Sequence, residues 1–439
     1  MKKKYRIILY TSIFLLCVVA SIILVVKKSN SVYEEESKPK VVKHKSMLSM
    51  NLEQTAGSGD YKTVTQSSWP TEGYKFNAEL SKCENGSTLS WDDTKKAVIM
   101  QGNVSDKCYV YFDIWIPSIA DYCTSGTDLA TCVKNFGDQG PSVSNIYIHN
   151  SSLTNGAGDN SYRYAGANPN NFVCFGSDAS PCPIDNLYRI IGVFGENYHG
   201  ANGKQLVKLI KYDYMTTDEL GTDGDYSQTY KEWGMDSTYK GTYGDGERIG
   251  VYYWNYKATG SATNTWSTSL LNKTNLNTNF INNIGTTWAN KIATVTWKVG
   301  GNTWANIGTK TSSVAYTNEI TNPVTTNTTD NATTYSAKIG LMYVSDYGFA
   351  ASPDAWTLTM SSYNNTTATN NNWMYMGLYE WTISRYADFS SLAFPVGSGG
   401  HVDYNYVNFN IGVRASFNLE SSVSYVSGSG SMSDPIVIN

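Results

Sequence analysis

The sequence predicts a β-rich α+β protein with an N-terminal transmembrane helix, a small antiparallel β module and a large domain with long loops. Tyr (33 residues) and Trp (12) are abundant while only 16% of residues are charged, a composition that suits extracellular β structure better than a cytosolic helical enzyme. Short stretches of alternating apolar and polar residues, separated by turn residues, recur along the chain. Apolar spacing between residues 268 and 293 predicts one or two short amphipathic helices.

The N-terminal segment predicts the compartment. Residues 7–26, IILYTSIFLLCVVASIILVV, form an apolar run of a length that spans a bilayer. The run leads directly into Lys27 and Lys28 without a small-x-small cleavage site, so an uncleaved anchor over residues 1–28 is favoured over a cleaved signal peptide. More positive charge precedes the run than follows it, which places the C-terminal part outside the cell membrane.

The charge balance bears on the class of partner. The formal net charge is −4, whereas a nucleic-acid-binding protein is expected to present a basic face. We therefore expect the membrane and an unknown protein or glycan ligand as partners, and no nucleic acid.

Six cysteines lie beyond the anchor. An even number in an exported region favours disulfides over free buried thiols, and the absence of a C-x-x-C pair makes zinc the weakest alternative. Local pairing is the simplest of the formally possible connectivities. It joins Cys83 to Cys108, Cys123 to Cys132 and Cys174 to Cys182.

Composition divides the rest of the chain into four parts. Residues 29–54 are polar and charged and predict a flexible stalk. Residues 55–118 alternate between strands and turns and predict a small disulfide-tied β module. Residues 119–144 are expected to be a connector, and residues 145–439 a single large domain. In that domain, NLYRIIGVFG (186–195) and KQLVKLIKYDYM (204–215) predict neighbouring core strands, and AKIGLMYVSDYGFA (337–350) predicts a strand that enters a loop.

Three blocks of the large domain carry a resemblance. They are NLYRIIGVFG with VKLIKYD, IGLMYVSDYGFA with NNNWMYMGLYEWTISR, and GVRASFNLESSVSYVSGSGSMSDPIVIN. Together they resemble uncharacterised membrane-anchored surface proteins of Gram-positive, gut-type bacteria, over roughly residues 60–439. The resemblance implies a C-terminal C-type-lectin-like domain of the formylglycine-generating type. It implies no particular biochemistry.

One departure from the family's pattern is visible, and a separate feature argues against the enzymes of that fold. The family's G-V-R-P is here Gly412 to Ala415, which removes a rigid residue at a strand start. The oxygen-dependent formylglycine generators use cysteines late in the domain, and this chain has none after Cys182. We therefore expect no enzyme activity and no catalytic residues. Trp381 and Arg414 are interpreted as structural, because a Trp between strand residues is usually core and a strand Arg usually holds a carboxylate or carbonyls.

A segment near the C-terminus has an unusual composition. From Thr382 to Leu419 the chain contains no Lys, Glu, Gln, Met or Trp. Those five types have no codon that ends in C, so the whole segment can be written in NNC codons. An ordinary Gly/Ser/Asn-rich hairpin is the alternative explanation.

This segment is similar to the variable region of targets of diversity-generating retroelements, in which AAC codons become any NNC codon. The similarity implies a hypervariable binding face at the end of a lectin-like domain. Tyr suits such a face because it offers a large contact area at low entropic cost, and Ser, Gly and Asn adapt their hydrogen bonds. The predicted ligand-binding residues are Tyr386, Asp388, Phe389, His401, Asp403, Tyr404, Asn405, Tyr406, Asn408, Phe409 and Asn410.

The acidic loop DYMTTDELGTDGDY (213–226) is a further candidate site. Its oxygen-rich side chains suit Ca²⁺, but their spacing does not fit the EF-hand loop, so a solvated loop is favoured and no cofactor or metal site is expected. Taken together, the sequence predicts a cell-surface, adhesin- or receptor-like binding protein. A structural envelope protein without a specific ligand, and a sulfatase-modifying-type or cell-wall enzyme, are the alternatives.

Overall fold

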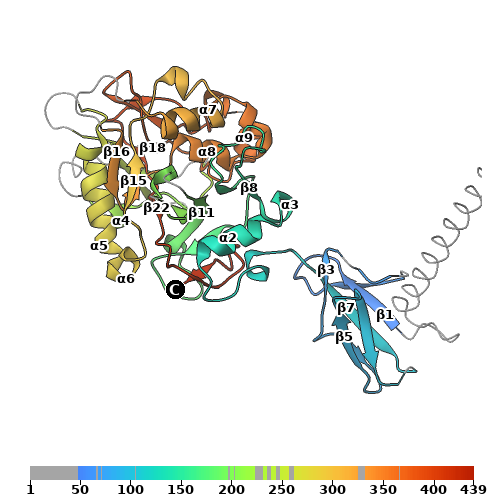
Figure 1. Cartoon of the computed structure of the whole chain (residues 1–439). Helices are drawn as coiled ribbons and strands as arrows, with labels where there is room; N and C mark the ends of the chain where they lie inside the picture. The colour runs from blue at the N-terminus through green and yellow to red at the C-terminus, as the bar shows by residue number, and fades with distance from the viewer. Residues whose placement is uncertain are drawn as a thin grey trace, which may run out of the picture. The chain divides into compact units, whose positions relative to one another are not determined.

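The chain forms two compact units, Met1–Ile116 and Pro117–Asn439. Figure 1 shows the computed structural model, which describes residues 48–65, 68–70, 72–103, 105–195, 198–201, 203–222, 231–234, 239–243, 248–256, 262–324, 332–364 and 366–439. The predicted anchor at 1–28 lies outside these residues. Among the residues that are described, no helix has the length and apolar character needed to cross a bilayer.

The first unit is built from short strands. They are β1 (Leu48–Glu53), β2 (Tyr61–Val64), β3 (Tyr74–Phe76), β4 (Lys82–Cys83), β5 (Thr88–Asp92), β6 (Ala97–Gln101) and β7 (Cys108–Ile114). The main sheet has the order β2-β1-β7-β3, β4 also pairs with β7, and β5 and β6 form a separate hairpin. The sequence predicted an antiparallel unit, but β1 pairs with β7 in parallel.

The stalk was predicted to reach residue 54, but strand β1 already begins at Leu48. Met50 and Leu52 are buried in the core of the first unit, where they pack in one cluster with Val110 and Phe112. The ring of Phe112 also contacts Trp91 of the hairpin edge-on, with centroids 5.6 Å apart. Charged residues before LSMNLE made the segment resemble the stalk in composition. In the sheet, Met50 and Leu52 are removed from water, which is favourable for apolar side chains.

The second unit contains the remaining strands and helices. Its strands are β8 (Ile146–Ile148), β9 (Tyr162–Tyr164), β10 (Phe172–Cys174), β11 (Leu187–Phe194), β12 (Leu206–Lys211), β13 (Lys231–Gly234), β14 (Arg248–Tyr252), β15 (Val295–Lys298), β16 (Thr334–Ala337), β17 (Ile339–Gly340), β18 (Glu380–Arg385), β19 (Leu392–Val396), β20 (Asn405–Tyr406), β21 (Ile411–Gly412), β22 (Ser416–Asn418), β23 (Tyr425–Ser427) and β24 (Val437–Ile438). Its α-helices are α2 (Leu129–Gly137), α3 (Pro141–Ser144), α4 (Thr217–Leu220), α5 (Ile281–Asn283), α6 (Gly285–Ala289), α7 (Ser312–Tyr316), α8 (Val344–Ala350) and α9 (Thr366–Asn370).

Short 3-10 and π-type helices complete the second unit. The 3-10 turns are η1 (Ile119–Asp121), η2 (Ile184–Asn186), η3 (Tyr198–Gly200), η5 (Trp266–Thr268), η7 (Trp304–Asn306), η9 (Pro353–Thr357) and η10 (Met360–Ser362), and the π-type helices are η6 (Leu271–Phe280) and η8 (Thr317–Thr321). The helix predicted from the apolar spacing is therefore present as η6, α5 and α6. The chain is α+β and strand-rich, as the sequence predicts.

Two sheets form the frame of the second unit (Figure 1). One has the order β17-β22-β12-β11-β9-β8, and the other has the order β13-β14-β21-β18-β19-β20. The predicted neighbours β11 and β12 pair antiparallel, with Tyr188 opposite Lys211. Every residue of β11 and β12 is buried, which explains their nearly unbroken apolar sequences.

Two predicted boundaries in the second unit need correction. The expected connector 119–144 holds α2, whose Leu129, Val133 and Phe136 are buried in the main core. This segment therefore belongs to the large unit. The predicted strand at 337–350 is only two residues long, and its second half is α8, whose residues are all buried. A fully buried short helix has no polar face, so its sequence lacks helical periodicity.

The locally paired disulfides predicted from the sequence are present. Cys83–Cys108 joins register partners on β4 and β7, Cys123–Cys132 ties the start of the second unit to α2, and Cys174–Cys182 closes the loop after β10.

Removal of the Cys83–Cys108 bridge is expected to destabilise the first unit by about 2–5 kcal/mol, as is typical of small exported domains. The C83S/C108S variant should show this loss in urea denaturation. Peptide mapping without reductant should recover all three linked pairs from the parent protein, and free thiols there would contradict the assignment.

Candidate ligand-binding face

The predicted binding segment, Tyr386–Asn410, follows β18 at the edge of the second sheet. It contains the turn into β19, the strand β19 itself, the loop that leads to β20, and the turn toward β21. Strand β20 is the last strand of the sheet and pairs with β19 through Leu392–Tyr406 and Ala393–Asn405. The segment thus consists of short loops that are attached to a buried strand pair.

The segment exposes four large aromatic side chains, which we call the aromatic face. Phe389, Tyr404, Tyr406 and Phe409 are 54%, 44%, 56% and 50% exposed. Among the described residues, the other large hydrophobic side chains of comparable exposure are aliphatic. Exposed aromatics gathered in one segment of the chain are typical of a binding surface.

Ring contacts join part of the aromatic face to residues that lie deeper. Tyr404 contacts Tyr386 and the indole of Trp304, with ring centroids 5.4 and 5.2 Å apart. Tyr386 in turn contacts Phe389 edge-on and stacks on buried Phe394. Trp304 lies outside the C-terminal segment, and no sequence motif marked it. It enters the cluster only because η7 packs beside β19.

Polar side chains accompany the aromatic face. Asp388 and Asn408 are exposed, and Asp403 and Asn405 are half-buried. His401 is half-buried, with its Nε2 3.9 Å from Asp403 Oδ2, and its ring lies over Gly397, where an added Cβ would be 2.8 Å from His401 Cε1. Carboxylates and amides beside aromatic rings can accept and donate hydrogen bonds to a ligand that stacks on the rings.

Some residues of the segment point inward. Val407, between the predicted binding residues Tyr406 and Asn408, is 1% exposed. Tyr386 and Asn410 are half-buried. From Tyr404 to Asn408, exposed residues alternate with half-buried Asn405 and buried Val407, as expected where successive side chains of an extended chain point to opposite faces.

Trp381 and Arg414 lie in the core. The Trp381 indole N–H donates to the Tyr252 carbonyl at 2.9 Å, and the side chain is fully buried. Arg414 donates from Nε and Nη2 to the two carboxylate oxygens of Glu380, at 2.7 and 2.9 Å. Burial raises the pKa of Glu380, while the Arg414 guanidinium lowers it. This geometry matches the structural roles expected for both residues.

A second charged cluster is enclosed in the core. Lys208 Nζ lies 2.6 Å from Asp346 Oδ2 and 3.1 Å from His199 Nδ1, and Arg163 pairs with Asp159 at 2.6 Å. Burial lowers the pKa of His199 well below its usual value, so the ring is neutral. The residues of this charged cluster come from distant positions in the chain, so no sequence pattern predicted it. Paired charges of this kind offset the desolvation cost of burying each of them.

Two described carboxylates of the acidic loop, Asp213 and Glu219, make separate contacts. Asp213 is buried and accepts from the Tyr239 hydroxyl and the Thr242 amide, and Glu219 caps α4 and pairs with Lys211. Asp223 and Asp225 lie outside the described residues. Within those residues, the group of potential metal ligands that lie close together is Cys83, Asp106 and Cys108. Its cysteines form a disulfide and offer no thiolate.

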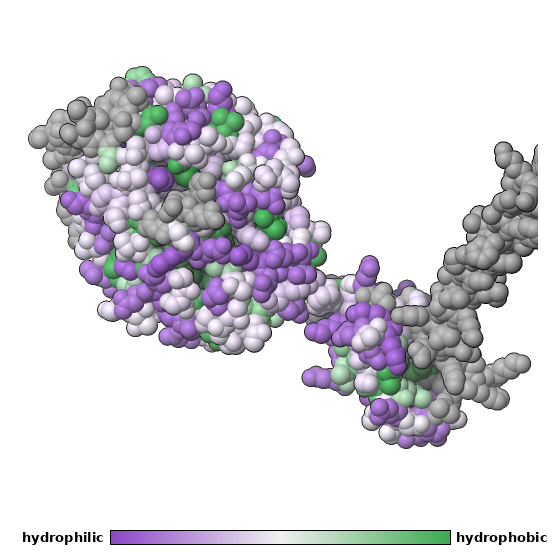
Figure 2. All heavy atoms as spheres, viewed as in Figure 1, coloured by the Kyte–Doolittle hydropathy of each residue, from purple (hydrophilic) through white to green (hydrophobic). Residues whose placement is uncertain are grey.

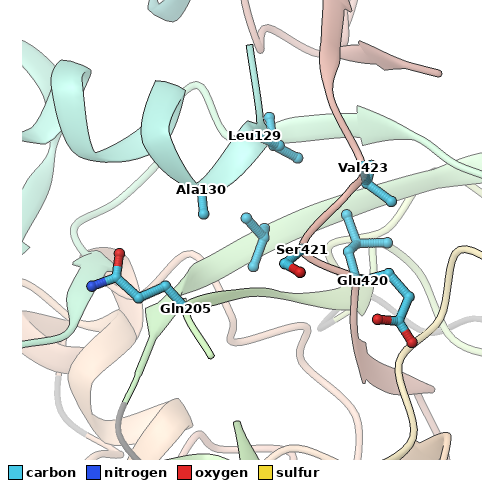
Figure 3. Close-up of a pocket in the computed structure, with 8 residues that line it drawn as sticks. Leu129, Ala130, Gln205, Glu420, Ser421 and Val423 are labelled. Carbon is cyan, nitrogen blue, oxygen red and sulfur yellow. The ribbon is translucent and has the colours of Figure 1, made fainter. Parts of the chain in front are cut away.

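Surface hollows occur in the described part of the second unit. One, of about 310 Å³, is lined by residues that include Lys134, Tyr162 and Gln205. Figure 3 shows another of about 170 Å³, where Leu129 and Ala130 of α2 lie near Gln205, Glu420 and Val423. It is smaller than typical small-molecule sites, which start at about 300 Å³. On the side of the second unit drawn in Figure 2, hydrophobic residues appear as small separate spots among polar ones. We take the aromatic face as the candidate site, because its exposed rings lose contact with water when a ligand covers them.

Comparison with known proteins adds no relative to this description. No family model, curated protein or solved structure matches the chain.

Proposed function

We propose that this protein is a cell-surface ligand-binding protein of the adhesin or receptor type. The segment of residues 7–26 anchors it in the membrane, and the aromatic face of a C-type-lectin-like domain binds a protein or glycan outside the cell. The observation that carries the proposal is the exposure of Phe389, Tyr404, Tyr406 and Phe409 within one short segment. Water contact with so much aromatic surface is unfavourable, and a ligand that covers it gains free energy.

The separation of side chains from scaffold supports a variable face. Trp381 and Arg414 are buried in the sheet that holds the segment, whereas Tyr404, Tyr406 and Phe409 are about half exposed. Exposed side chains can change with little effect on stability. A segment free of Lys, Glu, Gln, Met and Trp is consistent with diversification by NNC codons. A neighbouring reverse transcriptase gene with a near-copy of this segment would support that reading, and a sulfatase gene would favour the enzyme alternative.

A glycan and protein array probed with residues 48–439 tests the binding function. This range retains β1, which completes the sheet of the first unit. Binding of a defined ligand is the expected result. Absence of any ligand across a broad array would favour the structural envelope protein.

The Y404S/Y406S/F409S variant is expected to lose that ligand while it keeps its fold. Exposed residues contribute within about ±0.5 kcal/mol each to stability, whereas aromatic binding residues contribute about 2 kcal/mol or more each to affinity. Thermal denaturation and binding titration check the two effects separately. The matched control V426S/M432S/V437S replaces exposed aliphatic side chains elsewhere and should retain binding. Unfolding of the aromatic variant would show that these rings belong to the core.

A further inference from the structure

The main chain of the first loop in the binding segment is held from outside by one buried side chain. Asn264 is fully buried, and its Nδ2 group donates to the carbonyls of Tyr386, Phe389 and Leu392 at 2.9, 2.8 and 2.7 Å. The main-chain N–H of Asn264 also donates to the Ser390 carbonyl. Residues more than 120 positions away in the chain therefore set the path of the loop that presents Phe389.

The acceptors in this contact are all carbonyls. Every residue type supplies a carbonyl, so these hydrogen bonds do not depend on which side chains the loop carries. Tyr386, Phe389 and Leu392 could be exchanged for other residues and the acceptors would stay. The donor, in contrast, depends on one amide group, because neither alanine nor aspartate offers an N–H at that point.

Three further main-chain hydrogen bonds are likewise independent of side-chain type. The main-chain N–H of Asn255 donates to the Val407 carbonyl, and the main-chain N–H of Val407 donates to the Ser391 carbonyl. On the other side of the loop, the Ala387 amide donates to the Asn302 carbonyl. The side chain of Asn302 is itself fixed, since its Nδ2 donates to the Asn318 and Asn322 carbonyls. The loop is thus attached by main-chain groups on both sides.

We propose that Asn264 is a positioning residue that fixes the backbone of the aromatic face independently of the side chains displayed on it. The role of the face rests on the proposed function, but the attachment of the loop does not. Asn264 lies outside the segment from Thr382 to Leu419 that can be written in NNC codons. The residue that fixes the loop backbone is therefore encoded outside the stretch of codons that specifies the displayed side chains.

Hydrogen exchange on the full chain tests this proposal without a ligand. The amides of Tyr386, Ala387, Leu392 and Val407 are hydrogen-bonded in or beside the loop and report on its opening. In N264A, the carbonyls of Tyr386, Phe389 and Leu392 lose the side-chain donor that links them to a buried residue outside the loop, so exchange at these amides should accelerate at least about tenfold while β11 and β12 stay protected. N264D has the same size but turns a carboxylate toward three carbonyl oxygens, so its effect should be equal or larger.

Two controls separate positioning from general stability. N275A removes another fully buried asparagine, which donates to the Leu220 carbonyl, and should leave exchange in the binding segment unchanged. F389A changes the displayed side chain and should also leave it unchanged. If N264A does not fold, N264S retains one hydroxyl donor and replaces it in the comparison.

Three results would overturn the proposal: wild-type exchange in N264D, uniform acceleration across the whole unit in N264A or N264S, or equal acceleration in F389A. Loss of loop protection in N264A together with a negative ligand array would reject the binding function but leave the positioning role intact. Retained protection together with a positive array would do the reverse.

Discussion

Replacement of Trp381 by alanine is expected to unfold the second unit, with a loss of about 3–5 kcal/mol, the range for truncation of a large core side chain. The physical reason lies in a reciprocal pair of hydrogen bonds. Trp381 donates to the Tyr252 carbonyl, and the buried indole of Trp254 donates to the Thr382 carbonyl, both at 2.9 Å. The substitution leaves a cavity beside β18 and removes the indole donor of the Tyr252 carbonyl.

Urea denaturation of W381A and of F389A measures the contrast. Phe389 is also an aromatic residue near β19, but it is 54% exposed, so F389A should change stability by no more than about 0.5 kcal/mol. The two substitutions therefore divide the neighbourhood of β18 and β19 into core and surface. Equal stability of W381A and the parent protein would contradict the core assignment of Trp381.

Replacement of Glu380 by alanine is expected to cost about 3–5 kcal/mol, because it leaves the Arg414 guanidinium buried without its charged partner. Both side chains are almost fully buried, and Arg414 also donates to the Met374 carbonyl. The remaining carbonyl contact does not neutralise the charge. Thermal unfolding of E380A should show the loss clearly.

Two comparison variants test the cause of that loss. Replacement of both partners by apolar residues, as in E380L/R414M, should recover much of the stability, since no charge then stays buried. Removal of the exposed Lys107–Glu84 pair, 3.1 Å apart, should have far less effect because water screens it. If E380L/R414M were as unstable as E380A, the loss would come from packing and not from the unpaired charge.

Several features were predictable because they depend on short stretches of sequence. Cys83, Cys123 and Cys174 pair with the next cysteine along the chain, so spacing alone predicted all three bridges. The strands β11 and β12 are buried on both faces, and continuous apolar runs predict such strands well. The composition of the segment before Arg414 pointed to a surface segment, and its Phe389, Tyr404, Tyr406 and Phe409 are exposed, whereas Phe394 is buried.

Other features depend on contacts between distant parts of the chain. Strand β1 needs β7 beside it before Met50 and Leu52 have a core to enter. The segment of helix α2 was predicted as a connector. Its Leu129, Val133 and Phe136 recur at helical spacing after the capping residue Asp128, so a local helix signal was present, and only the fold shows that this face is buried.

The sequence alone determined the α+β class, the disulfide pairs and the location of the exposed aromatic residues, since each of these follows from residue type and local spacing. Only the tertiary structure decided which residues complete and support the aromatic face. Trp304 reaches Tyr404, and Asn264 reaches the carbonyls of the loop, through packing of segments far apart in the chain. Hydrogen bonds to main-chain carbonyls leave no trace in the composition of the acceptor segment, so the donor is recognisable only once the chain is folded.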